Sequence, residues 1–411
     1  MSGAEQQADV SIAHGLRLLT RPNLAKMFVA YLVSYTGTAM APIALAFGVL
    51  ELTGSTKDSA IVIAAPTLAA VFVLLFAGVI ADRSSRQRVI WISESVSMLA
   101  QFGMALLFLS GTATIPLLTG LMLVHGVVMA FHQPAAVGFI VQLVDADDLQ
   151  AANAVLSLAR FGAMAGGAAL GGLLVAYVGP GWTLAIDAAS FGISAVLVFS
   201  MTPKLQRPPE KATLLTDLRL GWREFTSHTW LWVIVVQFSL IVAAIEAVFG
   251  LLGPAYAKTQ LDGAGDWGLI AGGFGAGTMV GALAGIRVRP LYPMRFGTFC
   301  VFLLAGLPLA LAFGQPLWLG VLTAFCGGIA GQIFGVIWYT ALQKKIPSEM
   351  LSRVSAYDHL GSIALAPLGI VAGGYLFEYF GFQLALLVAA AMIIVPTVAV
   401  LFVKDVRTMQ L

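Results

Sequence analysis

The chain carries about twelve apolar stretches, each close to twenty residues long, and this feature restricts its possible folds more than any other. About twenty apolar residues in a helix cross the hydrocarbon core of a bilayer, where a helix satisfies its own backbone hydrogen bonds. Only 10% of the 411 residues are charged and 59% are hydrophobic, whereas about a quarter of a soluble domain is charged. We therefore expect an all-α membrane protein whose main partner is the lipid bilayer.

The stretches fall into two groups of six. The predicted spans lie near 24–50, 58–80, 88–110, 115–140, 150–177 and 181–201, and near 230–255, 267–286, 293–313, 316–341, 352–377 and 382–403. This division predicts an N-terminal six-helix bundle over 1–201, a linker over 202–229 and a C-terminal six-helix bundle over 230–411.

The basic residues are distributed unevenly between the two sides of the predicted membrane. Nineteen of the 22 lysines and arginines lie in the termini, the linker or the even-numbered connections. The opposite side has only Lys57 and Lys258, and Arg160 lies within a span. Cytoplasmic loops carry the excess of basic residues. We therefore expect a multi-pass protein of the inner (plasma) membrane with both termini in the cytoplasm.

The two halves resemble each other at a shift of 202 residues. The segment "LQAANAVLSLARFGAMAGGAALGGLLVAYVG" then falls on "LSRVSAYDHLGSIALAPLGIVAGGYLFEYFG". Two parallel six-helix repeats are a transporter design, with a solute cavity near the middle of the bilayer between the repeats.

The linker is expected to contain an amphipathic helix on the cytoplasmic membrane surface. It begins with the proline-rich segment "TPKLQRPPEK" and then places apolar residues on one helical face. These residues are Leu214, Leu215, Leu218, Trp222 and Phe225.

A charged turn between the second and third spans resembles the signature loop of the major facilitator superfamily. It reads "GVIADRSSRQR" from Gly78 to Arg88, with Ser85 in place of the usual glycine. The resemblance implies a fold of 12 transmembrane helices in two pseudo-symmetric bundles that works by alternating access. It also implies a conformational latch in which Asp82 meets the N-terminal end of the eleventh helix. The remaining latch residues would be Gly78, Arg83, Arg86 and Arg88, although Arg86 and Arg88 can also serve only as a cytoplasmic anchor.

Three further segments resemble a narrower branch of the superfamily, that of macrolide-efflux and enterobactin-exporter-like proteins. They are "MAFHQPAAVGFIVQLVDADDLQAANAVLSLARFG", "LAIDAASFGISAVL" and "LRLGWREFTSHTWLW". This resemblance covers essentially the whole chain and implies a drug:proton antiporter.

Ionisable groups at membrane depth are costly and mark functional sites. Glu246 lies about 24 Å into the seventh span. The superfamily lines its cavity with helices one, four, seven and ten, which makes Glu246 the first candidate for proton coupling. A carboxylate in a low-dielectric cavity can load and release a proton near neutral pH. The alternative is a packing role, with a hydrogen bond to a neighbouring helix or to water.

His125 is the second proton-coupling candidate, because histidine titrates in the physiological range. His132 follows on a similar face. A lone histidine within a span is more often a structural hydrogen-bond donor, which is the alternative for both rings. The superfamily's antiporters often carry an arginine before a glycine in the fourth helix. Here His125 precedes Gly126 instead, which departs from the usual arrangement.

Three more charges lie within spans. Arg160 needs an anionic or carbonyl partner, which Glu94, Glu246 or the solute could supply. Glu94 is a proton-coupling candidate, although its place near the basic turn favours a structural pairing with that turn. Asp187 is a further proton-coupling candidate, although similar sequences accept an amide there, which favours hydrogen bonding.

Glycines in the fifth span resemble the antiporter motif, with Ala168 in place of its proline. Small residues let helices approach closely. The expected packing residues and their copies in the second half are Gly167, Gly171, Gly172, Gly369, Gly373 and Gly374.

The candidate cavity wall is aromatic and hydroxyl-bearing, which suits a bulky lipophilic solute, neutral or cationic, better than a sugar. Its residues are Tyr31, Ser34, Tyr35, Thr38, Phe131, Gln332, Trp338 and Tyr339.

The sequence therefore predicts a secondary active exporter of hydrophobic small molecules, driven by a proton gradient without a cofactor or metal. A dedicated siderophore or secondary-metabolite exporter and a non-transporting solute sensor remain alternatives. No nucleophile, metal-ligand or phosphate-loop motif points to an enzyme, and the net charge of +2 gives no reason to expect nucleic acid. We expect a monomer.

Overall fold

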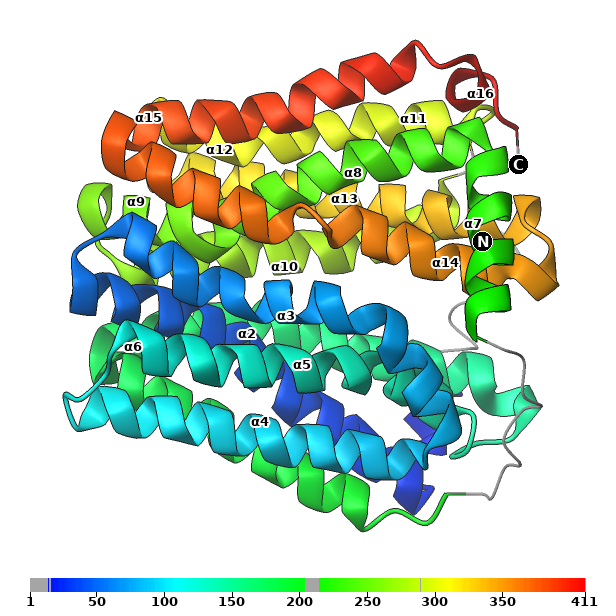
Figure 1. Cartoon of the computed structure of the whole chain (residues 1–411), viewed down its shortest axis with the longest axis horizontal. Helices are drawn as coiled ribbons and strands as arrows, with labels where there is room; N and C mark the ends of the chain where they lie inside the picture. The colour runs from blue at the N-terminus through cyan, green and yellow to red at the C-terminus, as the bar shows by residue number, and fades with distance from the viewer. Residues whose placement is uncertain (1–13, 15, 204–213, 289, 411) are drawn as a thin grey trace.

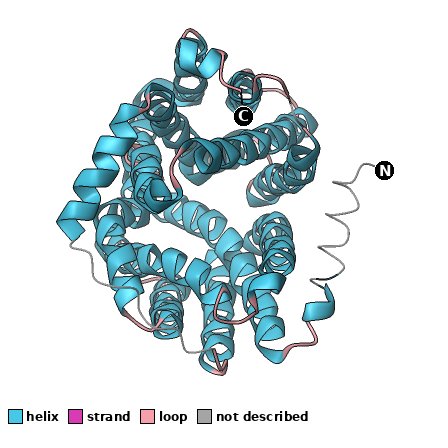
Figure 2. Ribbon diagram, turned by 90° about the vertical axis from the view of Figure 1, so that its right-hand side faces the viewer, coloured by secondary structure: helices cyan, strands magenta, loops and turns pink. Residues whose placement is uncertain are grey.

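The computed structural model describes residues 14, 16–203, 214–288 and 290–410. The side chains of 75–83, 146, 214–218, 286, 348–349 and 352 also lie outside its description. Every regular element of the described residues is a helix, and the loops lie between the helix ends (Figure 2).

The N-terminal half is built from five helical segments. They are α2 (Pro22–Thr53), α3 (Thr56–Arg83), α4 (Arg86–Leu109), α5 (Ile115–Ile140) and, after the short turn Ala146–Asp148, α6 (Leu149–Phe199). Helix α2 packs mainly on α6, α3 on α5, and α4 on both α5 and α6.

The C-terminal half begins with α7 (Leu214–Ser227) and continues in long helices with local interruptions. Its elements are α8 (Thr229–Ala247), the π-helical turn Val248–Leu252, α9 (Gly253–Gln260), α10 (Ala264–Arg287), α11 (Pro293–Val301), the 3-10 turn Phe302–Ala305, α12 (Gly306–Ala312), α13 (Leu317–Lys345), α14 (Ser348–Ile363), α15 (Ala366–Leu401) and α16 (Lys404–Arg407). Helix α8 packs mainly on α15, and α10 on α13.

Twelve membrane passes follow from these elements. Ten helical segments of the described chain are long and apolar enough to cross a membrane. Two of them contain a sharp kink, at Gly179 (φ 85°, ψ 169°) and Gly381 (φ 82°, ψ 168°), and therefore count as two passes each. A positive φ favours glycine because it has no Cβ. The two kinks lie 202 residues apart and share one backbone conformation, as a repeated sequence would produce.

The two halves lie side by side as two bundles (Figure 1). The first turns of α2 and the C-terminal helix α16 lie at the same end, which we call the terminal end, and the kinks lie at the opposite end, the far end. Between the halves, α6 contacts α10 and α3 contacts α15. The expected all-α fold of two six-helix bundles is thus confirmed.

The amphipathic helix α7 is docked on the C-terminal half. Phe225 is 6% exposed, and its ring packs beside Trp222 and Tyr357 of α14. Gly221 also lies directly against Arg353 and Tyr357. Part of the apolar face expected to lie on a membrane is therefore covered by protein, while Trp222 stays 54% exposed.

Candidate functional site in a cavity between the two halves

A cavity of about 230 Å³ lies between the two halves. The N-terminal half supplies residues of α2 to α6 to its wall, and the C-terminal half supplies Glu246, Gly250 and Ile370. The polar side chains in the wall are Thr38, Thr67, Gln101, His125 and Glu246. The first two proton-coupling candidates of the sequence, Glu246 and His125, therefore face one cavity.

Glu246 stands one residue before the end of α8, and its side chain is exposed in this cavity. Among the described residues it has no hydrogen-bond or ion-pair partner within the usual limits. The π-helical turn Val248–Leu252 follows directly. Pro254 explains part of this change, because it lacks the N–H that an α-helix would donate to the Gly250 carbonyl. π-Helical turns inside α-helices are frequent at functional sites.

His125 and Gln101 form the polar wall opposite Glu246's half. The His125 Nδ1 lies 3.1 Å from the Ser97 hydroxyl, and its ring meets the Phe191 ring edge-on at 5.7 Å. Gln101 is 2% exposed, and its side-chain oxygen has no hydrogen-bond partner among the described residues. The contacts of His125 fix its imidazole, and the Gln101 side-chain oxygen is left without a hydrogen bond beside the cavity.

Glu94 forms a buried pair with His132. The Glu94 Oε1 lies 3.0 Å from the His132 Nε2, and the two residues are 3% and 5% exposed. The Ser34 hydroxyl donates to the second Glu94 oxygen at 3.3 Å. The sequence suggested the basic turn or Arg160 as the partner of Glu94. The observed partner is His132 of the neighbouring helix α5.

Asp187 is fully buried between α2 and α6 and does not line the cavity. Its Oδ2 has no hydrogen-bond partner among the described residues, and the Ser190 hydroxyl lies 3.4 Å from its Oδ1. Gly37 of α2 packs directly on both side chains, so a larger residue there would displace them.

Arg160 is an exposed cation on α6 whose guanidinium lies over an aromatic ring. Its Cζ lies 5.1 Å from the Tyr35 ring centroid and 6.0 Å from that of Phe161. Every ion pair observed in the described part of the chain lies elsewhere, so neither Glu94 nor Glu246 is its partner within 4.0 Å. The solute remains the third of the partners that the sequence allowed.

The remaining candidates for the cavity wall separate into different environments. Only Thr38 lines the 230 Å³ cavity. Ser34 and Trp338 are 8% and 6% exposed and are committed to buried carboxylates, Ser34 to Glu94 and Trp338 to Asp358. Tyr339 is 61% exposed. Tyr31 packs edge-on against Tyr35 at 5.2 Å. Phe131 and Gln332 are half-buried outside this cavity.

Of the five residues expected to form the latch, three have side chains outside the described part of the chain. Gly78, Asp82 and Arg83 belong to the last two turns of α3, but their side chains lie outside the described residues. Arg86 donates to the Gly138 carbonyl of α5 at 2.7 Å, a contact within the N-terminal half. Arg88 is exposed. Helix α3 contacts α14, the helix that contains the N-terminal end of the eleventh span, which is where the latch is expected.

The packing glycines make equivalent contacts in the two halves. Gly167 and Gly171 lie against the α2 backbone, as Gly369 lies against that of α8, and Gly373 packs on side chains of α8 and the π-helical turn. Gly172 instead meets Ala264 and Gly268 of α10, and Gly374 meets Thr56 and Ala60 of α3. The third glycine of each copy therefore joins the two halves to each other.

Three functional candidates were absent from the sequence prediction. Gln101 and Asp358 are polar residues within spans, the same signal that selected Glu246. The third is the contact between Thr56 and Glu378, in which the Thr56 hydroxyl and backbone N–H both donate to the Glu378 Oε2. No single-sequence signal identifies this pair, because its members lie 322 residues apart.

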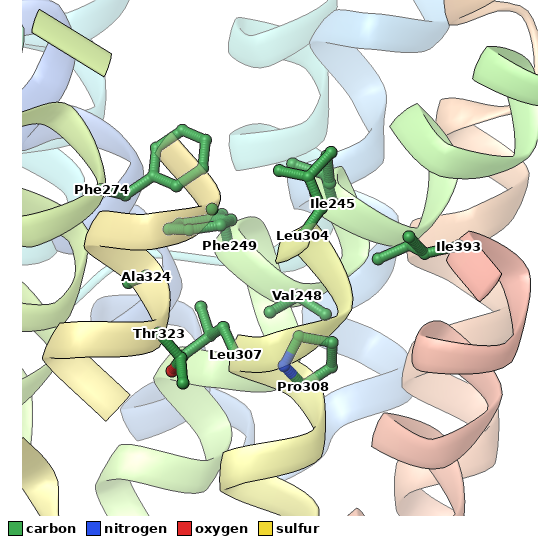
Figure 3. A pocket seen from close by; sticks show the side chains of 11 residues that line it. Ile245, Val248, Phe249, Phe274, Leu304, Leu307, Pro308, Thr323, Ala324 and Ile393 are labelled. Carbon is green, nitrogen blue, oxygen red and sulfur yellow. The ribbon is translucent and has the colours of Figure 1, made fainter. Parts of the chain in front are cut away.

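A second void lies within the C-terminal half and has no such chemistry. Figure 3 shows its lining, which includes Phe249, Phe274, Leu304 and Leu307. Its volume is about 10 Å³, and the hydroxyl of the lining residue Thr323 donates to the carbonyl of Leu319. A void of this size holds at most one water molecule.

Two pseudo-symmetric six-helix bundles with a cavity between them that contains membrane-depth ionisable groups are the architecture of a secondary transporter. Comparison with known proteins gives the family. The chain belongs to the transmembrane secretion effector family of the major facilitator superfamily, whose pattern matches residues 15–410.

The curated relatives include enterobactin exporters. The chain is 27% identical over 369 residues to the enterobactin exporter EntS of Escherichia coli O6:K15:H31, covering 86% of each protein. It is equally similar to EntS of Shigella dysenteriae serotype 1. Among solved structures, the nucleoside transporter NupG aligns with a TM-score of 0.74 at 15% identity, over 92% of this chain and 98% of that one. A similarity at that identity establishes the fold alone.

Proposed function

We propose that the protein is a secondary active exporter of hydrophobic small molecules, drugs or antibiotics among them, and that it exchanges them for protons. The observation that carries this proposal is the unpartnered carboxylate of Glu246 in the cavity between the halves. A carboxylate at this depth is costly unless it is used. Homology to an exporter supports the direction of transport.

The proposed cycle follows from competition at one site. Ionised Glu246 attracts a proton when the cavity is hydrated, and the protonated acid is the less costly form when the cavity is closed. If solute and proton occupy the cavity in alternation, each favours a different conformation of the transport cycle. The movement of one is then coupled to the movement of the other. The proton gradient would supply the energy, so no cofactor enters the scheme. His125 stands in the same cavity as a second proton acceptor.

We place the protein in the inner membrane as a monomer. Both termini would lie in the cytoplasm, as the distribution of basic residues predicts. On this orientation the contacts between Gly172, Gly374 and their partners close the outer side of the molecule. The latch at Asp82 would then act on the cytoplasmic side during the opposite step.

The test uses purified protein in proteoliposomes with an imposed pH gradient. We expect gradient-driven export of a lipophilic dye or macrolide by the wild type, and its loss in Glu246→Gln. Asp405→Asn, which alters an exposed acid outside the spans, is the matched control and should transport normally. Undiminished gradient-driven transport in Glu246→Gln would refute the role of Glu246 and transfer it to His125.

A dedicated siderophore or secondary-metabolite exporter is the second candidate, favoured by the 27% identity to EntS. The same assay with a catecholate siderophore in place of the dye distinguishes the two. Solute binding without any flux would instead identify a sensor.

A further inference from the structure

We propose that Arg160 and Tyr35 form a binding subsite for an aromatic anion. The inference deepens the proposed export function and rests on it in taking the bound solute as cargo. It also reverses one expectation from the sequence, which allowed a cationic solute.

The first step concerns the position of Arg160 between the halves. Ala165 of α6 packs against Gly275 of α10, where the two halves touch. Arg160 lies five residues before it, about 7.5 Å toward the terminal end. Arg160 therefore lies close to the inter-half contact along α6, with its guanidinium over Tyr35 of α2.

The second step concerns its missing counter-ion. A guanidinium stays charged at every relevant pH and is costly within a membrane unless an anion or water balances it. Glu94 is already bound to His132 and Ser34. Asp358 of α14 is 8% exposed and accepts the Trp338 indole N–H at 3.0 Å. Both buried acids therefore have other partners.

The third step concerns the shape of the site. The Tyr35 ring lies 5.1 Å from the guanidinium carbon, and Tyr31 supports that ring edge-on. Stacking on one face leaves the N–H donors at the guanidinium edge available, and these match a planar acid group. An aromatic solute with an acid substituent would place its charge on Arg160 and its ring against that of Tyr35.

The experiment measures binding, so it needs neither a gradient nor transport. Three probes with one ring system but different charge are used, namely 1-naphthoate, 1-naphthamide and 1-naphthylmethylamine, each titrated into protein in lipid nanodiscs. We expect the anion to bind about ten-fold or more tightly than the amide, as one charge-assisted hydrogen-bond pair implies, and the amine to bind most weakly. Equal binding of all three probes by the wild type would overturn the proposal.

Variants assign the preference to the site. Arg160→Gln should abolish the preference for the anion, while Arg160→Lys should keep part of it. Tyr35→Leu should weaken binding of both naphthoate and naphthamide, and Tyr35→Phe should restore it. Arg295→Gln is the matched control, because Arg295 also lies 6.0 Å from a ring centroid, that of Phe299, but on the outer helix α11. A preference for naphthoate that survives in folded Arg160→Gln would also refute the assignment.

The outcome separates this inference from the proposed function. Arg160-dependent binding of naphthoate without transport in proteoliposomes would leave the subsite standing and refute export of this solute class. Gradient-driven export of lipophilic dyes without a preference for naphthoate would support export and refute the subsite.

Discussion

Glu378 of the C-terminal half caps the first residue of α3 in the N-terminal half. Its Oε2 accepts hydrogen bonds from the Thr56 backbone N–H at 2.8 Å and from the Thr56 hydroxyl at 2.9 Å. The first N–H groups of a helix lack partners within the helix, and a negative charge is favoured at this end. A helix cap that usually comes from within one chain segment here connects two bundles.

Removing this cap should open the far end. We expect Glu378→Ala to raise the ratio of open to closed molecules about ten-fold or more, because charge-assisted hydrogen bonds are lost. Spin labels at Ser110 and Gln315, exposed at the far end in different halves, would report the distance distribution after Cys300 and Cys326 are replaced by serine. Glu51→Gln, an exposed acid near the same end, should leave the distribution unchanged. An unchanged distribution in Glu378→Ala would show that the cap does not hold this end closed.

Gly172 should tolerate no side chain while the far end is closed. A Cβ there would collide with the Ala264 carbonyl and the Gly268 backbone of α10. We expect Gly172→Ala to shift the same spin-label distances toward the open form. Gly166→Ala on the same helix is the control, since a Cβ there meets nothing within 4 Å. Identical behaviour of the two variants would contradict the close approach.

The Glu94–His132 pair should contribute measurably to the stability of the N-terminal half. A buried hydrogen bond to a charged group contributes roughly 1.5–3 kcal/mol, and we expect Glu94→Gln to lower the free energy of unfolding by about that amount. Detergent-denaturation curves of Glu94→Gln, His132→Asn and the double variant form the appropriate cycle. Strictly additive effects would mean that the two side chains do not interact.

Acid should weaken the attachment of the N-terminal segment at the terminal end. Asp148 lies 2.8 Å from His14 and 2.7 Å from Arg21, and these contacts, the hydrogen bond to His14 foremost, hold the pKa of Asp148 below its ordinary value of 3.8. A lowered folded-state pKa adds stability above 3.8 that disappears as the pH falls through the lowered value. Thermal unfolding should therefore separate the wild type from Asp148→Asn at pH 6 and show no difference near pH 2. A difference that is constant with pH would contradict this linkage.

The sequence predicted the fold because the bilayer imposes simple rules. Apolar length located the helices, and the two glycines at the kinks, 202 residues apart, already matched in the repeat. Glu246 was found because a carboxylate inside a span is conspicuous. The structure adds that it shares a cavity with His125.

Side-chain partners could not be predicted in the same way. The pairing of Glu94 with His132 depends on the rotation of α4 against α5, and hydropathy does not fix this rotation within an apolar bundle. Thr56 and Glu378 each look like ordinary loop-flanking residues until the two halves are placed together. Trp338 was expected at the solute wall, but its indole N–H is used by Asp358.

The glycine contacts between the halves bear on how reversible the motion is. Gly172 and Gly374 bring backbones together without large side chains, so separating the halves there exposes little apolar surface. Hydrophobic free energy scales with that surface, at about 25 cal/mol per Å². The closed far end is therefore held by close backbone packing and a few hydrogen bonds. The free-energy difference between its closed and open forms is then small enough for one bound solute or one proton to reverse.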